Sequence, residues 1–329
     1  MSELVVKNPS MLIARASKAW KFLHGTINVY KPSGMLTTTL INAIKRNLCD
    51  DLNSMQLDEP KPLVQIESAD NKNYSVQLVP NLGQDILATG PRYTQDMLKI
   101  FAADHLGVHT SGVMVLGINK GVRFANLLKN GAPIQTFHVT GKFGKATETN
   151  FQGDRCTLRG GYKHVTSGRL QALLSSLQTT YQKQMYEMSG LDIQSQSAYE
   201  LACKGLIRPL NTKNTVIYGI RNTEFTGKTF TIEVQTMNAS EEMLASLVLD
   251  VAVQLKTVAH CTKIRCTRYG YFSFEDSLLR SHWNLQNVLK SMHQCQRIWN
   301  EHPQMVSEDV ATPVGYEEVM NKAYRKPSK

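Results

Sequence analysis

Two short segments contain the residue types that could take part in chemistry. One is the motif Lys31-Pro-x-Gly34, and the other is the apolar run over residues 109–117, with Asp104 and His105 just before it. A lysine beside a turn is suited to contact phosphate, and a carboxylate near histidines is suited to acid–base chemistry. A solvated loop acid or a helix cap is the plainer interpretation of Asp104, and loop histidines are usually only solvated. Residue types alone therefore leave the chemistry open.

Several familiar classes of site are missing from the sequence. It contains no GxGxxG, Walker, HExxH or GxSxG motif, which argues against P-loop, metal-enzyme and α/β-hydrolase chemistry. Its six cysteines form no CxxC pair, so we expect no metal site. The formal net charge is +10, from 37 basic and 27 acidic side chains. This charge favours a polyanionic partner such as RNA or DNA, although many basic soluble proteins have a similar charge.

The elements that must position these residues follow from apolar periodicity. Alternation around Ile27 and Val29 predicts a strand that stops at Pro32, and the apolar run over 109–117 predicts a buried strand. Further strands are expected over 135–143, 230–235 and within 259–274, and helices over 37–48, around 170–177 and around 244–255. Asn238, with Glu241 three residues on, matches a capping box that would begin the last helix. Strands and helices interleave without strict βαβ order, which predicts an α+β fold with a mixed, largely antiparallel sheet flanked by helices.

We expect one main domain with an additional segment at each end. Residues 1–15 are an N-terminal segment that could be an import signal. The main domain is expected over 16–292, with an acidic, proline-broken insertion at about 50–93 that contains strands near 63–66 and 74–79. A basic, loosely ordered tail is expected over 293–329. The longest apolar stretch, 243–255, is interrupted by Asp250 and is too short to span a bilayer.

The order of motifs along the chain resembles one enzyme family. Lys31-Pro-x-Gly34 is followed by Ser111-Gly112-Val113 and an apolar strand, which resembles the TruB branch of the pseudouridine synthases. Further matching stretches are 144–147, 197–210, 255–257 and 265–272, and these are more similar to the mitochondrial mRNA-modifying branch of that family. The resemblance extends over about residues 16–292.

This resemblance implies a fold and a reaction. Members of the family have a mixed sheet flanked by helices, with an RNA-binding cleft across it. They isomerise uridine to pseudouridine without a cofactor, so the substrate here would be tRNA or mitochondrial mRNA. A catalytic aspartate begins C–N bond cleavage, an aromatic ring stacks on the flipped base, and a basic residue keeps the aspartate ionised. The resemblance favours a mitochondrial location, with a nuclear or cytoplasmic one as the alternatives.

The family's catalytic residues are missing from the matching positions. Alignment on Ser111-Gly112-Val113 places Gly107 where the family has its aspartate, Phe137 where the stacking tyrosine is usual, and Ala245 where the family has arginine. Asp104 is the nearby acid that could substitute, but a shift of about an ångström can cost a hundredfold in rate. Glycine has no side chain that can attack or accept a proton. The pattern therefore predicts a chain that kept the fold and the RNA cleft but lost the chemistry.

Three hypotheses remain from the sequence. The first is an active RNA pseudouridine synthase, and the second is a catalytically silent RNA-binding protein or a mitochondrial RNA or ribosome assembly factor. The third is a protein-interaction scaffold without RNA, against which the net charge argues mildly. The first two allow protein partners in mitochondrial RNA granules. Four cations are expected to contact RNA phosphates, namely Lys31, Lys120, Arg265 and Arg268.

Overall fold

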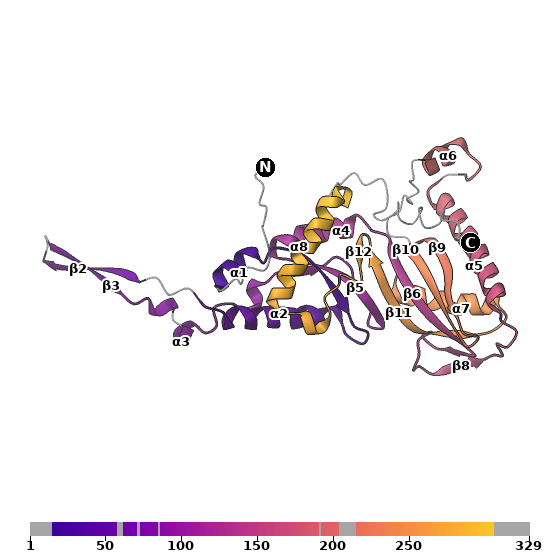
Figure 1. Ribbon diagram of the computed structural model, residues 1–329, viewed down its shortest axis with the longest axis horizontal. Helices are drawn as coiled ribbons and strands as arrows, with labels where there is room; N and C mark the ends of the chain where they lie inside the picture. The colour runs from indigo at the N-terminus through magenta and orange to yellow at the C-terminus, as the bar shows by residue number, and fades with distance from the viewer. Residues whose placement is uncertain are drawn as a thin grey trace.

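An eight-stranded sheet forms the centre of the molecule (Figure 1). The computed structural model describes residues 15–57, 62–70, 73–84, 86–190, 192–203 and 215–305. The strand order is β1-β5-β11-β6-β10-β9, with β4 paired to β5 and β12 paired to β11. Only β5 and β11 run parallel, and the other neighbouring pairs in this sheet are antiparallel. The structure therefore confirms the predicted α+β fold with a mixed, largely antiparallel sheet flanked by helices.

The strands of this sheet include all those expected from the sequence outside the insertion. They are β1 (Gly25–Lys31), β4 (Ile100–Ala102), β5 (Thr110–Ile118), β6 (Gln135–Phe143), β9 (Val216–Phe225), β10 (Thr229–Met237), β11 (Ala259–Tyr269) and β12 (Phe272–Ser273). Two further hairpins are β2 (Leu63–Asp70) with β3 (Asn73–Val79), and β7 (Lys145–Thr147) with β8 (Cys156–Arg159). All nine residues of β5 are buried, as expected for a Gly-bounded apolar run.

The helices extend the predicted ranges. They are α1 (Ala16–Phe22), α2 (Thr37–Ser54), α3 (Ile86–Thr89), α4 (Val122–Asn130), α5 (Ser167–Met188), α6 (Gln196–Cys203), α7 (Glu241–Gln254) and α8 (Leu285–Glu301). The helix expected over 37–48 continues to Ser54 because its apolar stripe does: Leu40, Ile44, Leu48 and Leu52 are all fully buried. None of the helices in the described part of the chain is both long and apolar enough to cross a bilayer.

The two faces of the central sheet carry different residues. Side chains alternate along a strand, whereas residues paired across strands share a face. One row of paired residues crosses β1, β5, β11 and β6 at Lys31, Gly112, Cys266 and Phe137. We call their side of the sheet the Phe137 face. The adjacent row crosses β11, β6, β10 and β9 at Arg265, His138, Glu233 and Arg221, and we call its side the His138 face.

Helices cover these faces unequally. On the Phe137 face, Val248 of α7 packs directly over Gly141 of β6, where a larger residue would clash. On the His138 face, α8 packs against β1, because Trp299 Nε1 donates a hydrogen bond to Thr26 Oγ1 at 2.7 Å. The side chains of Arg221 and His138 remain 52% and 40% exposed on that face. The half of the His138 face formed by β11, β6, β10 and β9 is thus open to solvent at these positions.

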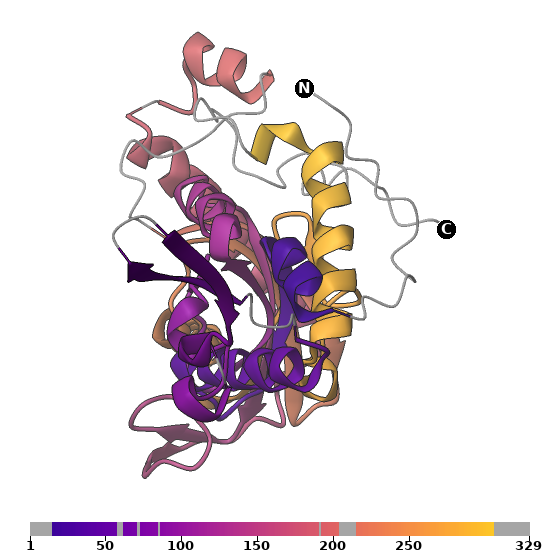
Figure 2. The same ribbon diagram turned by 90° about the vertical axis from the view of Figure 1, so that its left-hand side faces the viewer.

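A two-stranded arm extends away from the sheet and points toward the viewer in Figure 2. It consists of β2 and β3, which lie within the insertion expected at about 50–93 and match the strands predicted there. Its register places four apolar side chains on one side of the ribbon: Val64, Ile66, Val76 and Leu78. They are 60–71% exposed, so the arm has an uncovered apolar face.

The ends of the expected domain fall partly outside the described residues. Residues 1–14 and 306–329 lie outside them, so the expected import signal and most of the expected tail have no structural account. The boundary expected between residues 292 and 293 falls inside α8, which continues to Glu301. The second half of that helix buries Cys295 and Trp299.

Candidate functional site

The loop between β4 and β5 is held by the segment that follows β1. Five consecutive carbonyls, from Leu106 to Thr110, each accept a hydrogen bond from residues 31–37. Lys31 Nζ donates to the carbonyls of Gly107 and Thr110 at 2.8 Å each, and Gly34 N donates to the carbonyl of Val108 at 2.8 Å. The Lys31-Pro-x-Gly34 motif therefore has a structural task, which is to fix the loop that contains Gly107.

Lys31 itself is wholly buried. Its third hydrogen bond goes to the carbonyl of Pro32 at 3.3 Å, so all three donors of the ammonium group are in use. Burial lowers the pKa of Lys31, and the negative charge of Glu241 opposes that shift. In this arrangement no donor of Lys31 is left to contact a phosphate.

The carboxylate of Glu241 fills the space beside Gly107. Its Oε2 accepts hydrogen bonds from Thr110 N at 2.7 Å and from Thr110 Oγ1 at 2.6 Å. A Cβ atom on Gly107 would lie 2.7 Å from Glu241 Oε1 and nearer still to Oε2 and Cδ. Real Cβ atoms do not approach other atoms this closely, so the carboxylate occupies the place where any side chain at position 107 would begin.

Sequence reasoning missed Glu241 as a member of this site. The predicted capping box at Asn238 is wrong, because α7 begins two residues later with Ser240 as its N-cap and Ser240 Oγ accepts from Met243 N at 3.2 Å. The Glu241 side chain turns away from its own helix toward the loop before β5. An acid in the first turn of a helix is the only signal that the sequence offers, and that signal is usually local. Ala245, one turn further on, is fully buried and contributes only a methyl group.

Asp104 is anchored rather than free. Its Oδ1 accepts from His105 N at 2.8 Å, and its Oδ2 accepts from the side-chain amide of Gln135 at the start of β6. Burial raises the pKa of Asp104, although these hydrogen bonds and nearby positive charges oppose the shift. The charge of Asp104 also contributes, after burial of the phenol, to raising the pKa of Tyr269. The carboxylate thus links the loop to the sheet.

The other expected site residues are not all brought together. Phe137 lies on the same face as Lys31, but its ring is in the core and only 2% exposed, so a base reaches it only if the side chains above it move. Lys120 is exposed at the opposite end of β5 from Gly107. Arg265 and Arg268 pair with His138 and Thr136 and so lie on the His138 face, on the far side of the sheet. Within the described segments, no group of three or more His, Cys, Asp or Glu side chains is placed to hold a metal ion.

Comparison with known proteins identifies the family. The family model described as TruB family pseudouridylate synthase (N terminal domain) matches residues 95–240, which include the Gly107 loop, β5 and β6. The mitochondrial pseudouridylate synthase TRUB2 of Mus musculus is 35% identical over 273 residues, which cover 81% of this chain and 82% of that protein. The chain belongs to the TruB family. TRUB2 of Xenopus tropicalis is 31% identical over 288 residues, or 85% of this chain and 88% of that protein.

Less similar proteins match as well. The tRNA pseudouridine synthase B of Mycobacterium avium is 24% identical over 187 residues, which cover 54% of this chain and 60% of that protein. Among solved structures, the archaeal box H/ACA sRNP Nop10–Cbf5 complex matches with a TM-score of 0.43 and 14% identity. That match covers 91% of this chain but 62% of the solved chain. In this TruB-family chain, Lys31 holds the loop around Gly107, and a carboxylate from α7 lies in the space where a side chain at position 107 would start.

Proposed function

We propose that this chain is an RNA-binding member of the TruB family that does not isomerise uridine. The observation that carries the proposal is the Glu241 carboxylate at Gly107, the position that the resemblance assigns to the catalytic aspartate. Position 107 has no acidic side chain of its own, and the Glu241 side chain from α7 fills the space beside it. Ala245 supplies no positive charge where the family has arginine, and the nearby ammonium group of Lys31 has all three donors bound to backbone carbonyls.

Glu241 is poorly placed to act as the missing nucleophile. An aspartate carboxyl group begins one C–C bond, about 1.5 Å, beyond its Cβ atom. The Glu241 carboxyl carbon lies farther than one bond length from that Cβ position, and its Oε2 is already held by both donors of Thr110. Its carboxyl carbon is therefore offset by about 0.8 Å or more from that of an aspartate at position 107. An offset of about an ångström can cost a hundredfold in rate.

The RNA partner and the location rest on the relatives and the charge. Relatives are named as a mitochondrial pseudouridylate synthase and as a tRNA pseudouridine synthase, so tRNA and mitochondrial RNA are the proposed ligands and mitochondria the proposed location. The net charge of +10 supports a polyanionic ligand. A role in mitochondrial RNA or ribosome assembly, with protein partners in RNA granules, follows from RNA binding without chemistry.

The test compares four proteins on a pool of tRNA and mitochondrial RNA. They are the native chain, the double variant Gly107→Asp/Ala245→Arg, the triple variant that adds Glu241→Ala, and Glu241→Ala alone as the control. Pseudouridine is measured by chromatography of the digested nucleosides, and RNA binding by filter retention. We expect RNA binding by the native chain without pseudouridine, and pseudouridine from the triple variant only, because the double variant still holds Glu241 against the new aspartate.

Two results would overturn the proposal. Pseudouridine formation by the native chain would mean that Glu241 or Asp104 is a working catalytic acid. A native chain that retains no RNA from either source at moderate salt would mean that the family's RNA binding has been lost together with the chemistry.

A further inference from the structure

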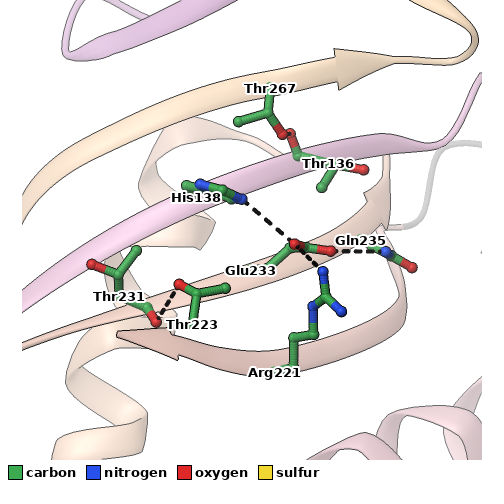
Figure 3. A network of polar contacts seen from close by, with 8 residues as sticks. All are labelled: Thr136, His138, Arg221, Thr223, Thr231, Glu233, Gln235 and Thr267. Carbon is green, nitrogen blue, oxygen red and sulfur yellow. Dashed lines mark hydrogen bonds and ion pairs between the residues drawn. The ribbon is translucent and has the colours of Figure 1, made fainter. Parts of the chain in front are cut away.

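A row of charged and hydrogen-bonding side chains crosses the His138 face (Figure 3). Arg265, His138, Glu233 and Arg221 are directly paired across β11, β6, β10 and β9. With neighbouring strands about 4.8 Å apart, three steps give a row about 14 Å long. A single small anion cannot contact both ends of a row of that length.

Glu233, the one acid in this row, is bound by neighbouring side chains of the same face. Glu233 Oε2 lies 2.6 Å from Arg221 Nη2 and 3.5 Å from His138 Nε2, and Gln235 Nε2 donates to Glu233 Oε1 at 3.0 Å. Burial alone would raise the pKa of Glu233, but the hydrogen bonds from His138 and Arg221 and the charge of Arg221 lower it from 4.5 to about 2. Glu233 therefore stays ionised and fully engaged, and its charge does not repel an anion strongly.

Three other cations on the same face, Lys142, Lys263 and Arg265, form no ion pair among the residues that the structure describes. Lys263 pairs with Thr140 and Lys142 lies two residues further along β6, so both belong to the His138 face. Lys263 is exposed and Lys142 is partly exposed, so both ammonium groups are accessible to a ligand.

Arg265 is held in place by aromatic rings. Its guanidinium carbon lies 4.6 Å from the ring centroid of Phe274 and 5.5 Å from that of Tyr30. Its Nε is buried without a hydrogen-bond partner in the described part of the chain. A guanidinium group positioned by stacking presents its remaining donors in a fixed fork, which matches the oxygens of a phosphate.

Side chains next to this row carry hydroxyl groups. Thr140 and Thr231 contact each other at 3.2 Å, and Thr223 Oγ1 donates to the Thr231 carbonyl at 3.0 Å. Arginine, lysine and threonine are typical of contacts to phosphate and sugar, whereas protein interfaces favour aromatic and apolar side chains and are poor in lysine. Glu224, which pairs with Thr231, is the other acid of this half of the face, and the cations outnumber the two acids.

From these observations we infer that the His138 face of β11, β6, β10 and β9 binds the phosphodiester backbone of single-stranded RNA. This surface lies on the opposite side of the sheet from Gly107 and Glu241. The inference rests on the proposed RNA binding and adds a second contact surface that does not use the family's catalytic face. It assigns Lys142, Lys263 and Arg265 to the RNA, with Arg265 fixed by Tyr30 and Phe274.

The test is the salt dependence of binding to a fluorescently labelled polyuridylate strand, followed by anisotropy. The variant is Lys142→Glu/Lys263→Glu, and the matched control is Lys18→Glu/Lys21→Glu on α1, which changes the net charge by the same amount. Loss of two phosphate contacts should lower the slope of log K against log salt by about 1.4, because each contact on a single strand contributes about 0.7. The affinity of the face variant should fall at least tenfold, and that of the control by much less. Unchanged thermal unfolding shows that the face variant is folded.

Each other outcome overturns the inference. If the native chain and the face variant bind RNA with the same affinity and the same salt slope, RNA uses another surface, while the proposed function stands. An equal loss in the α1 control would show an effect of net charge only. Equal competition by polyglutamate of the same charge would indicate an acidic protein partner instead. A native chain that binds no RNA would refute the proposed function itself.

Discussion

Replacement of Gly107 with alanine tests the contact on which the site depends. Gly107 has no left-handed backbone angle, so an alanine there meets no backbone strain. Its methyl group would instead lie 2.7 Å from Glu241 Oε1 and nearer to Oε2. Carbon and oxygen atoms need more than 3 Å, so the Glu241 side chain must swing away from the loop. The carboxylate then loses both hydrogen bonds from Thr110 and its position near the buried Lys31.

The size of the effect follows from those lost contacts. A hydrogen bond to a charged group contributes about 1.5–3 kcal/mol, and the two bonds here share one acceptor oxygen. We therefore expect Gly107→Ala to lower the free energy of unfolding by about 2–4 kcal/mol. Glu241→Ala removes the same bonds directly and should cost a similar amount. In the double variant the alanine at position 107 has room, so it should cost almost nothing more.

Urea unfolding followed by tryptophan fluorescence measures this double-mutant cycle. The expected coupling energy between the two sites is about 2–4 kcal/mol, well above the additivity error of about 0.5 kcal/mol. Additive losses within that error would refute the reasoning, because they would show that Glu241 does not stand in the space of a side chain at position 107. Gly161→Ala is a suitable control, since its Cβ would meet nothing within 4 Å.

Three further predictions follow from other parts of the molecule. The folded-state pKa of Glu233 is about 2 against 4.5 in the unfolded chain, so its stabilisation is present above pH 4.5 and lost as the pH falls toward 2. Glu233→Gln should remove roughly 3 kcal/mol of that acid sensitivity, measured by urea unfolding between pH 5 and 2.5, and an unchanged pH profile would contradict it. Iodoacetamide should modify the exposed Cys156 of the folded protein long before the buried Cys295, whose pKa burial raises to about 12; equal labelling by mass spectrometry would disprove the packing of α8. Ile66→Thr and Val76→Thr in the arm, both 65% exposed, should each change the unfolding free energy by less than about 0.5 kcal/mol, and a loss above 1 kcal/mol would show that the arm is packed.

Local periodicity was enough to predict most of the fold. The alternation around Ile27 and Val29 and the apolar run over 109–117 gave β1 and β5, which are neighbours in the sheet. These patterns arise because one face or both faces of a strand are buried. Buried positions are apolar, so the sequence shows them directly. The mixed, largely antiparallel sheet followed from the order of such segments.

The site was harder to predict because its contacts are long-range. Lys31 was expected at the surface. Instead, backbone carbonyls of a loop more than 70 residues away in the sequence replace water as the hydrogen-bond acceptors of its ammonium group. Glu241 lies more than 130 residues from Thr110, and its role depends on where α7 begins and which way one side chain turns. Arg265 and Cys266 are adjacent in sequence, so they point to opposite faces of β11; only the pairing register shows that Phe137 lies with Cys266 and His138 with Arg265.

The filled space beside Gly107 also constrains the evolutionary paths open to this protein. A single substitution that restores an aspartate at position 107 places it against the Glu241 carboxylate, so the restored residue is harmful before it can be useful. The order of changes therefore matters: position 241 must change first, although that step alone brings no catalytic gain. The effect of an aspartate at position 107 thus depends on the residue at position 241, which is sign epistasis between a loop and a helix. Homologous chains with a carboxylate at the position of Glu241 should accordingly have a small residue at the position of Gly107.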